Sequence, residues 1–507
     1  MSIAHLKGTS NPKIIIIGSG FAGIGMAIRL KQSGINQFIL LEKASSVGGT
    51  WRDNHYPGAA CDVQSHLYSF SFEAKPDWSH MFGKQSEILS YIEHCVEKYQ
   101  LAPHLRFGCE ISGAEYDQAN GLWNIQTKDG QLFSANEIIS ASGGLSQPTL
   151  PNILGIEKYQ KESFHSSRWN HNFSVENKTI SVIGTGASAI QFVPELLKQG
   201  AKVKLFQRTP PWILPKPDRK IGKFEQNIYK KLPILQNIFR QSIFWKLEAR
   251  ATGMVNFPWI LKIGQKLAKR HLKKIVKDPV LCEKLTPNYT IGCKRILLSN
   301  NYLQAMQHPN LELITDAVTE ITEQGVSTAN AEHSCDAIIY GTGFSAAENC
   351  IPFPVTGKNQ QTLSDYWKSI NGAEAYKGIS VNGFPNWSFI VGPNTLLGHS
   401  SIILMIEPQV EHILRLIKER RIRNLKSIEV SESAQQEWNK IIRKRSEKTV
   451  WQSGGCQSWY LTKDGKNTTL WPGFTFEFKK ALLANDISNY QLEEYTASSA
   501  TADEQIA

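Results

Sequence analysis

Two glycine-rich turns lie far apart in this chain, and each is followed at the same distance by a charged side chain. The first turn reads GSGFAG from Gly18 to Gly23, and the second reads GTGASA from Gly184 to Ala189. Glu42 and Arg208 each lie 24 residues after the first glycine of their turn. In a strand–turn–helix–strand unit, that distance puts the charged residue where it can contact the ribose of a bound dinucleotide.

The opposite charges predict different ligands for the two turns. A carboxylate accepts hydrogen bonds from a free ribose 2′-hydroxyl and repels a 2′-phosphate, so Glu42 indicates FAD or NAD. Arg208, with the hydroxyl of Thr209 beside it, indicates the 2′-phosphate of NADP. An ordinary solvent-facing arginine at a strand end is the alternative for Arg208. The sequence therefore predicts that two different dinucleotides bind at once.

Regular elements must hold these turns in place. Gly18 is expected to make the tight turn, Gly20 to let the backbone approach a pyrophosphate, and Gly23 to let the helix pack closely, a position where the second unit has the permitted Ala189. Free N–H groups at each helix start would face the phosphates. Periodicity predicts strands at 13–17, 37–41, 179–183 and 202–206, with helices at 22–32 and 187–198. The predicted fold is α/β, with two Rossmann-like dinucleotide-binding domains.

Further segments suggest how the domains are ordered along the chain. Strands at 131–141 and 335–344 each lead into a glycine turn that would close a dinucleotide unit, and long amphipathic helices predict a helical region inserted in the second unit. We expect an FAD-binding domain at 1–150 and 346–495, an NADP-binding domain at 151–218 and 288–345, a helical insertion at 219–287, and a disordered tail at 496–507.

Composition narrows the class of protein. Eight cysteines are scattered without a CxxC or CxxxxC pair, which predicts a reducing compartment and argues against a disulfide framework, a zinc site or a redox-active dithiol. The N-terminus runs directly into the first predicted strand, which leaves no room for a signal peptide. The uncharged stretch 378–406 is rich in Gly, Pro and Asn and does not resemble a membrane span. We therefore expect a cytoplasmic protein without a transmembrane segment.

The formal net charge is +11, and much of the excess lies between Lys262 and Lys277. This segment could form a face that binds a membrane surface or nucleic acid. A solvated amphipathic helix that also attracts a phosphorylated cofactor is the interpretation favoured by the sequence, and no nucleic-acid partner is expected. Nothing in the sequence sets the oligomeric state, and a monomer is the simplest expectation.

Three segments between and after the turns resemble the Baeyer–Villiger monooxygenases. GGTWRDNHYPGAACD, from Gly48 to Asp62, matches the family's GGxW…(F/Y)PG…D pattern. YQKESFHSSRW resembles its FxGxxxHxxxW signature at His165 and Trp169, with Tyr159 and Lys161 departing from the first two positions. TPNYTIGCKRILLSNNY resembles the segment that carries the family's active-site arginine, here Arg295. The similarity extends from residue 14 to about 490.

This resemblance implies an enzyme that uses FAD, NADPH and O2. NADPH would reduce the flavin, O2 would add to give a C4a-peroxyflavin, and a ketone would become an ester or lactone, with sulfides as further substrates. The peroxide is nucleophilic only as an anion, so a permanently protonated arginine suits the chemistry. The resemblance assigns catalysis to Arg295, with Asp62 as the partner that fixes its guanidinium. For Asp62 a loop-capping role is the alternative.

The same resemblance, together with the turns, assigns the cofactor contacts. Lys294 would join Arg208 on the phosphate or be a solvated lysine, and Trp459 would lie in a mobile lid near NADP or in an ordered surface loop. Trp51 and Tyr56 would flank the isoalloxazine ring or be core aromatics, and His165 and Trp169 are interpreted as hinge residues. The residues expected to bind FAD are Gly18, Gly20, Phe21, Ala22, Gly23, Glu42, Lys43, Gly49, Thr50, Trp51, Tyr56, Asp62 and Tyr68. Those expected to bind NADP are Gly184, Thr185, Gly186, Ala187, Ser188, Arg208, Thr209, Lys294, Arg295 and Trp459.

Three other functions compete with this interpretation. A flavin-containing monooxygenase would oxygenate nitrogen or sulfur of small molecules, but Arg295 and Trp169 favour the Baeyer–Villiger reaction. A disulfide reductase shares the architecture, yet the sequence offers it no suitable cysteine pair. A basic, non-enzymatic binding protein would be colourless and would bind polyanions with steep salt dependence.

Overall fold

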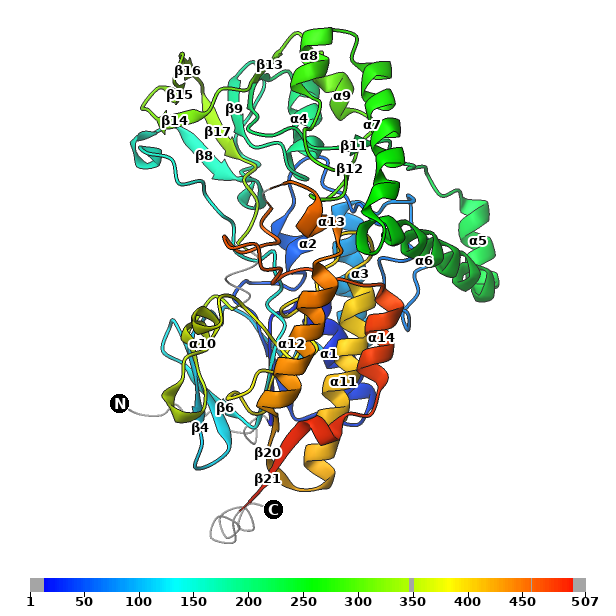
Figure 1. The fold of residues 1–507 in the computed structure, drawn as a ribbon, viewed down its shortest axis with the longest axis vertical. Coiled ribbons are helices and arrows are strands. Elements are labelled where there is room, and N and C mark those ends of the chain that lie inside the picture. Colours follow the sequence, from blue (N-terminus) through cyan, green and yellow to red (C-terminus); the bar gives the residue numbers. More distant parts are fainter. Residues whose placement is uncertain (1–12, 346–350, 457, 496–507) are drawn as a thin grey trace.

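The computed structural model describes residues 13–345, 351–456 and 458–495, which form two lobes, each built around its own parallel sheet (Figure 1). The sheet of the first lobe has the order β19-β7-β1-β2-β3, and every neighbouring pair is parallel. Its strands are β1 (Ile14–Ile17), β2 (Phe38–Leu41), β3 (Leu105–Arg106), β7 (Glu137–Ser140) and β19 (Trp387–Phe389). Because β19 comes from the C-terminal third of the chain, the last segment returns to the first lobe.

Helices and two small sheets complete the first lobe. The order β18-β4-β5-β6 defines one small sheet, and β20 pairs with β21 in the other. The strands are β4 (Ile111–Asp117), β5 (Leu122–Thr127), β6 (Leu132–Ala135), β18 (Val355–Thr356), β20 (Leu425–Val430) and β21 (Tyr490–Glu494). The helices are α1 (Phe21–Gln32), α2 (Thr50–Asp53), α3 (Gln85–Lys98), α10 (Leu363–Ser369), α11 (Ile403–Ile422), α12 (Glu432–Ser446), α13 (Val450–Ser453) and α14 (Thr475–Leu483).

The second lobe repeats the plan with the strand order β13-β10-β9-β17-β8. All four pairings are parallel, as expected for a sheet whose strands are linked by helical crossovers. The main strands are β8 (Glu162–His165), β9 (Thr179–Ile183), β10 (Lys202–Phe206), β13 (Leu311–Ile314) and β17 (Ala337–Tyr340). Smaller strands are β11 (Ile213–Leu214), β12 (Leu297–Leu298), β14 (Val318–Ile321), β15 (Gly325–Thr328) and β16 (Glu332–Ser334). Helices α4 (Ala189–Lys198) and α9 (Tyr302–Ala305) pack together in this lobe.

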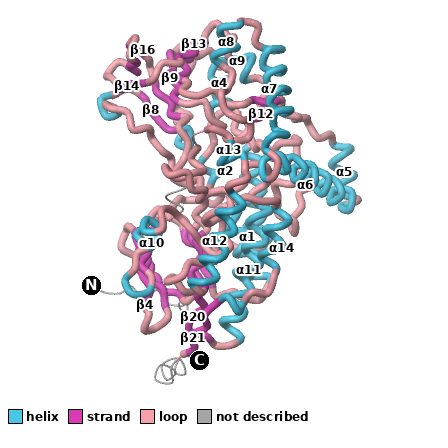
Figure 2. Tube along the Cα trace, viewed as in Figure 1, coloured by secondary structure: helices cyan, strands magenta, loops and turns pink. Residues whose placement is uncertain are grey.

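A helical arm interrupts the second lobe between β11 and β12. It contains α5 (Lys223–Lys231), α6 (Pro233–Val255), the short turn η4 (Pro258–Ile260), α7 (Leu261–Ile275) and α8 (Pro279–Lys284). In Figure 1 and in the tube of Figure 2, α5 and the outer part of α6 project from the body of the molecule. The predicted fold class, two Rossmann-like units with a helical insertion in the second, is confirmed by this architecture.

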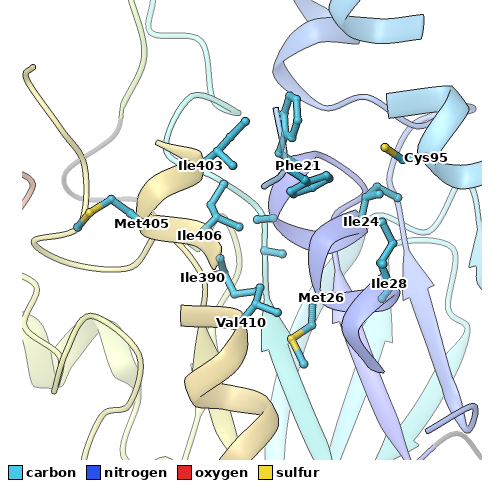
Figure 3. Packing of buried hydrophobic residues seen from close by; sticks show 14 of the residues in the cluster. Phe21, Ile24, Met26, Ile28, Cys95, Ile390, Ile403, Met405, Ile406 and Val410 are labelled. Atoms are coloured by element: carbon cyan, nitrogen blue, oxygen red, sulfur yellow. The ribbon is translucent and has the colours of Figure 1, made fainter. Parts of the chain in front are cut away.

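The first lobe is held together by packing of α1 against α11, helices about 370 residues apart in sequence. Ile24 and Ile28 of α1 and Ile406 and Val410 of α11 belong to one buried cluster, shown in Figure 3. This burial, at roughly 25 cal/mol for each Å² of apolar surface, ties the C-terminal segment to the first glycine turn. We propose that the two sheets are the cores of the domains delimited above; residues 496–507 lie outside the described residues.

Candidate active site

The first glycine turn joins β1 to α1 in a conformation that requires glycine. Gly18 has a φ of +101°, and a Cβ at this position would lie 2.7 Å from the carbonyl oxygen of Ala141, which follows β7. Helix α1 then begins at Phe21 without a side-chain cap and without an acidic residue in its first turn. Its free N–H groups therefore suit an anion. The other residues expected along this turn and the loop facing it are Gly20, Ala22, Gly23, Gly49 and Thr50.

Glu42, at the end of β2, is buried and bound on all sides. One carboxylate oxygen accepts hydrogen bonds from the backbone N–H (3.0 Å) and the hydroxyl (2.7 Å) of Ser19. The other oxygen accepts from the N–H of Ala44 at 3.0 Å and lies 3.2 Å from Nη1 of Arg52. Burial opposes the charge of Arg52, but contacts with Asp53 and Glu42 outweigh it and raise the pKa of the guanidinium. Glu42 is therefore held in position before any ligand binds.

Aromatic side chains gather beside this turn. Trp51 donates its indole N–H to the hydroxyl of Tyr68 at 3.1 Å, and the two rings meet edge to face. Phe21 packs against Tyr68 in a similar T-shaped contact with centroids 5.4 Å apart. Lys43 extends toward the carbonyl of Ser146 at 3.5 Å. Trp51, Tyr68 and Phe21 thus form an apolar wall next to the predicted cofactor.

The second turn has the same backbone plan. Gly184 has a φ of +109°, and a Cβ there would lie 2.4 Å from the carbonyl oxygen of Gly341, which follows β17. Thr185 donates its hydroxyl to the carbonyl of Thr209 at 3.3 Å, so the turn is tied to the end of β10. Helix α4 also starts without a side-chain cap or an acidic residue in its first turn. Gly186, Ala187 and Ser188 line this approach.

Arg208 and Lys294 differ from Glu42 because no carboxylate pairs with them in the described part of the chain. Arg208 is exposed, and Lys294 stacks over the ring of Tyr289 at 5.2 Å. Burial and the nearby charge of Arg208 together lower the pKa of Lys294. Two cations held close without an anion form a site that suits a phosphate.

Arg295 and Asp62 meet although 233 residues separate them. Nε of Arg295 donates to Oδ2 of Asp62 at 2.5 Å and Nη2 donates to Oδ1 at 2.8 Å, a bidentate pair, while Nη1 donates to the carbonyl of Leu397 at 3.1 Å. Burial opposes ionisation of Asp62, but Arg295 outweighs it and lowers the pKa of the carboxyl, while the charge of Asp62 raises the pKa of Arg295. Their side chains remain 33% and 29% exposed, so the pair still faces an open space.

Tyr56 packs as a core aromatic, one of the two alternatives that the sequence left open for it. Its ring belongs to the core of the second lobe, 5.9 Å from Phe192 and 6.5 Å from Trp169, and its hydroxyl donates to Gln191 of α4 at 2.9 Å. The YPG segment therefore connects the two lobes, whereas Trp51 remains at the first turn. The physical reason is that the chain leaves α2 and crosses toward α4 within a few residues, which sequence spacing does not show.

His165 and Trp169 have structural surroundings. His165 ends β8, where Nδ1 accepts a hydrogen bond from the N–H of Ser167 at 3.1 Å, and burial lowers the pKa of the imidazole. Trp169 packs against Phe164 and Phe192. The two departures from the family signature meet at one point, because the Tyr159 hydroxyl and the Lys161 ammonium both donate to the carbonyl of Cys335. These hydrogen bonds and ring contacts hold in place the segment that links the two lobes.

In the loop that carries Trp459, the next residue, Tyr460, lies beside Arg295. Tyr460 is buried, burial raises the pKa of its hydroxyl, and the charges of Arg295 and Asp62 also act on it. Trp459 itself is 47% exposed and packs edge to face on Tyr460. No sequence signal singles out Tyr460, because its contact with the site depends on how this loop folds beside Arg295.

A disulfide joins Cys293 to Cys456, which corrects the expectation that the chain has no disulfide. The bond lies two residues before Arg295 and three residues before Trp459, so it ties the arginine segment to the loop. The cysteines are 163 residues apart, and local cysteine spacing therefore carries no signal of the pairing. The other described cysteines, Cys61, Cys95, Cys109, Cys282 and Cys335, are free and buried.

Further polar groups near Arg295 had no sequence signal. His399 lies two residues beyond Leu397, and its Nε2 is 3.6 Å from Glu248 of α6. Both side chains are almost fully buried, and Glu248 accepts two hydrogen bonds from Thr475. Helix α6 thus reaches from the arm to the segment that follows Leu397, whose carbonyl accepts a hydrogen bond from Arg295.

The donor set fits two dinucleotides. Each helix start offers free N–H groups to a pyrophosphate, Glu42 places a buried carboxylate at the strand end where a free ribose is expected, and Arg208 with Lys294 offers donors to a 2′-phosphate. Between the two turns, a fixed arginine, Arg295, faces an open space. This arrangement could stabilise negative charge on a molecule bound between the cofactors.

Comparison with known proteins supports this assignment. A family model described as pyridine nucleotide-disulphide oxidoreductase matches residues 15–233. The chain is 46% identical to a "Baeyer-Villiger monooxygenase" of Pseudomonas aeruginosa over 95% of this chain and 91% of that protein. It is 41% identical to a protein of the same name from Streptomyces coelicolor, over 96% and 94%. A crystal structure of OTEMO in complex with FAD and NADP superposes with a TM-score of 0.85 at 26% identity, covering 95% of this chain and all of that one.

Proposed function

The chain belongs to the Baeyer–Villiger monooxygenase family and is an NADPH-dependent flavoprotein monooxygenase, and we propose that it converts a ketone to an ester or lactone. In the balanced reaction, ketone, O2, NADPH and a proton give the ester, NADP+ and water. We assign FAD to the first glycine turn and NADP to the second. The charges of Glu42 on one side and of Arg208 with Lys294 on the other support this order.

The observation that carries the proposal is the bidentate pair of Arg295 and Asp62. An arginine keeps its proton at every working pH, and Asp62 raises its pKa further. Two hydrogen bonds from one carboxylate hold the guanidinium plane in one orientation. We infer that the exposed remainder of Arg295 faces the space between the two cofactors, where it would meet a bound ketone.

The cofactors and the protein divide the chemistry between them. When bound, FAD takes electrons from NADPH and activates O2. Arg295 then supplies a fixed positive charge for the negative charge that develops on the ketone oxygen as oxygen adds to the carbonyl carbon. Asp62 and the carbonyl of Leu397 position Arg295, and Tyr460 covers it from the side of the Trp459 loop. Covering the site excludes water, which strengthens the electrostatic contribution of Arg295.

Oxidation of sulfides is a second activity that we propose for the same site. A sulfide receives an oxygen atom on its lone pair, so no oxyanion forms on the substrate, and Arg295 has less charge to stabilise. We therefore expect substitution of Arg295 to lower ester formation more than sulfoxide formation. The reverse pattern would favour an enzyme dedicated to nitrogen or sulfur oxygenation.

The proposal is tested with the purified, yellow holoenzyme and a panel of ketones and sulfides. NADPH oxidation is followed with and without each substrate, and products are identified by gas chromatography with mass spectrometry. We expect ketone-stimulated NADPH oxidation coupled to ester or lactone. If the flavin is reduced by NADPH but no ketone of the panel yields an ester, the assignment of Baeyer–Villiger activity is wrong.

A further inference from the structure

The positive charge of the chain is concentrated on the helical arm. Residues 223–277 contain thirteen Lys and Arg but only two Glu, a net charge of +11 that equals the formal net charge of the whole chain. Of the two acids, Glu248 is buried and Glu225 is ion-paired with Arg219. The charged groups on the exposed surface of α5, α6 and α7 are therefore almost all positive. In the rest of the chain, positive and negative charges are equal in number.

Large apolar side chains are exposed among these cations on α7 and on the turn η4 that leads directly into it. Trp259, Ile263 and Leu267 follow one another at four-residue spacing and are 64%, 62% and 55% exposed. That spacing keeps them on one face of the helix, and the lysines and arginines of α7 fall within the same half of its circumference. On the opposite half, Leu272 is buried in the core of the second lobe, and Ala268 is buried in a separate cluster that includes Met254 and Trp451. The basic residues on the exposed half are Lys262, Lys266, Lys269, Arg270, Lys273 and Lys274.

Helix α6 also exposes large apolar side chains. Ile234, Ile238 and Trp245 lie along one face, with exposed fractions of 62%, 58% and 57%, and Phe224 of α5 is 80% exposed. Lys246 and Arg250 are exposed near the inner end of the helix. In Figures 1 and 2, α5 and the outer part of α6 project from the body, so this surface is accessible to a large partner.

We propose that this arm, residues 223–277, binds the surface of an anionic phospholipid bilayer. A solvated amphipathic helix, the interpretation favoured by the sequence, accounts for the lysines but not for exposed Trp, Ile and Leu between them, because such side chains gain nothing from water. At a bilayer interface, the cations can bind lipid phosphates, and the apolar side chains can insert at the boundary of the acyl chains. Tryptophan is the side chain best suited to that boundary.

Other partners match only part of this surface. Two copies of the arm would each bring a charge of +11 to a shared interface, so self-association there is opposed electrostatically. A nucleic acid would satisfy the cations but would leave the aliphatic side chains exposed. No helix in the described ranges has the length and apolar character to cross a bilayer, so the arm would lie on the membrane.

The test is co-sedimentation of the full-length, FAD-loaded protein with vesicles of defined composition. We expect binding to vesicles with about 30% phosphatidylserine in phosphatidylcholine, little binding to pure phosphatidylcholine, and at least about a ten-fold loss of binding at high salt. Quenching of tryptophan fluorescence by brominated phospholipids would report insertion of Trp245 and Trp259 at the interface.

Matched variants separate the two components of binding. The apolar variant W259S/I263Q/L267Q and the charge variant K266E/K273E should each weaken vesicle binding about ten-fold or more. The controls are I422Q, at an 80% exposed position of α11, and K440E/K444E, which changes the net charge equally on α12. Both controls should bind vesicles like the wild type. NADPH oxidation with a water-soluble ketone should be unchanged in all four variants, which confirms that they are folded.

Several results would overturn the proposal. If the apolar variant binds anionic vesicles as well as the wild type does, the arm is an unspecific polyanion site. Equal affinity of the wild type for single-stranded DNA would lead to the same conclusion. Absence of binding to anionic vesicles contradicts it outright. Sedimentation velocity that shows a dimer lost in the apolar variant, without vesicle binding, would assign the face to a second copy of the chain.

Discussion

The two glycine turns share a backbone plan, but the charged residues that follow them differ in burial and in their ion-pair partners. In the first unit, Glu42 is buried, with each carboxylate oxygen already contacted by Ser19, Ala44 or Arg52. In the second, Arg208 is exposed, and its neighbour Lys294 carries a like charge that no described carboxylate balances. The first site is thus preorganised and enclosed, as suits a permanently bound flavin. The second lacks an anion, as suits a nucleotide that arrives and leaves.

The largest effect is expected at Arg295, where the two sites meet. Arg295→Ala should lower ester formation by at least about 1,000-fold, because a charge aimed at the developing oxyanion is lost. Anaerobic reduction of the flavin by NADPH should persist, since both turns remain intact. Stopped-flow absorbance and product analysis measure the two steps. Arg295→Lys, which keeps the charge but not the bidentate geometry, is the control, and ester formation retained by the alanine variant would show that another residue acts.

The enclosed site is tested at Glu42. Glu42→Ala leaves Ser19 and Arg52 without their buried acceptor, so we expect the free energy of unfolding to fall by about 2 to 3 kcal/mol and the protein to purify with much less FAD. Flavin content per chain and thermal unfolding followed by circular dichroism measure both. Glu42→Gln keeps an acceptor for Ser19 and should retain more FAD. Full flavin content in the alanine variant would contradict the preorganised site.

The open site is tested at Arg208. Arg208→Ala should raise the KM for NADPH by about 10- to 100-fold and leave that for NADH nearly unchanged, because only NADPH carries the 2′-phosphate. Stability should change little, since Arg208 is exposed and unpaired. Steady-state kinetics with both nucleotides decide the matter. An unchanged preference for NADPH would place the phosphate on other side chains.

A smaller, pH-dependent effect is expected at Lys294. Burial and the charge of Arg208 lower its pKa below the ordinary value of 10.5, so its proton is lost earlier as the pH rises. The charged form that attracts the phosphate is therefore present at neutral pH and is depleted on the alkaline side. We expect the KM for NADPH to rise several-fold there in the wild type and to stay flatter in Lys294→Arg. Parallel curves for the two proteins would argue against a contact of Lys294 with the phosphate.

The smallest change in turnover is expected at the disulfide that joins the arginine segment to the Trp459 loop. Cys456→Ser releases the loop from Cys293, so proteolysis near Trp459 should be faster and the KM for NADPH a few-fold higher. Limited proteolysis with mass spectrometry and kinetics measure these effects. Cys282→Ser, at a buried and unpaired cysteine, should behave like the wild type. A loop equally resistant to proteases in both variants would show that the bond does not restrain it.

Much of the fold followed from local patterns. The strand at 179–183 and the strand at 202–206 coincide with β9 and β10, and the helix predicted at 22–32 differs from α1 by one residue. These elements could be predicted because β-branched runs ending in glycine, followed by helical periodicity, leave little choice of conformation. The surroundings of Tyr56 could not be predicted, because a turn such as YPG does not reveal the direction in which the chain leaves it.

The sequence by itself determined the two units and the charge that each presents, because glycine positions and strand-end residues act within a single unit. The family resemblance already implied that Asp62 pairs with Arg295, and the structure shows this contact. Only the tertiary structure decided that Cys293 meets Cys456 and that Glu248 meets His399. Such contacts depend on the packing of whole lobes, which local spacing does not encode. The structure likewise showed that the arm exposes its apolar side chains among its lysines, because burial is a property of the folded chain.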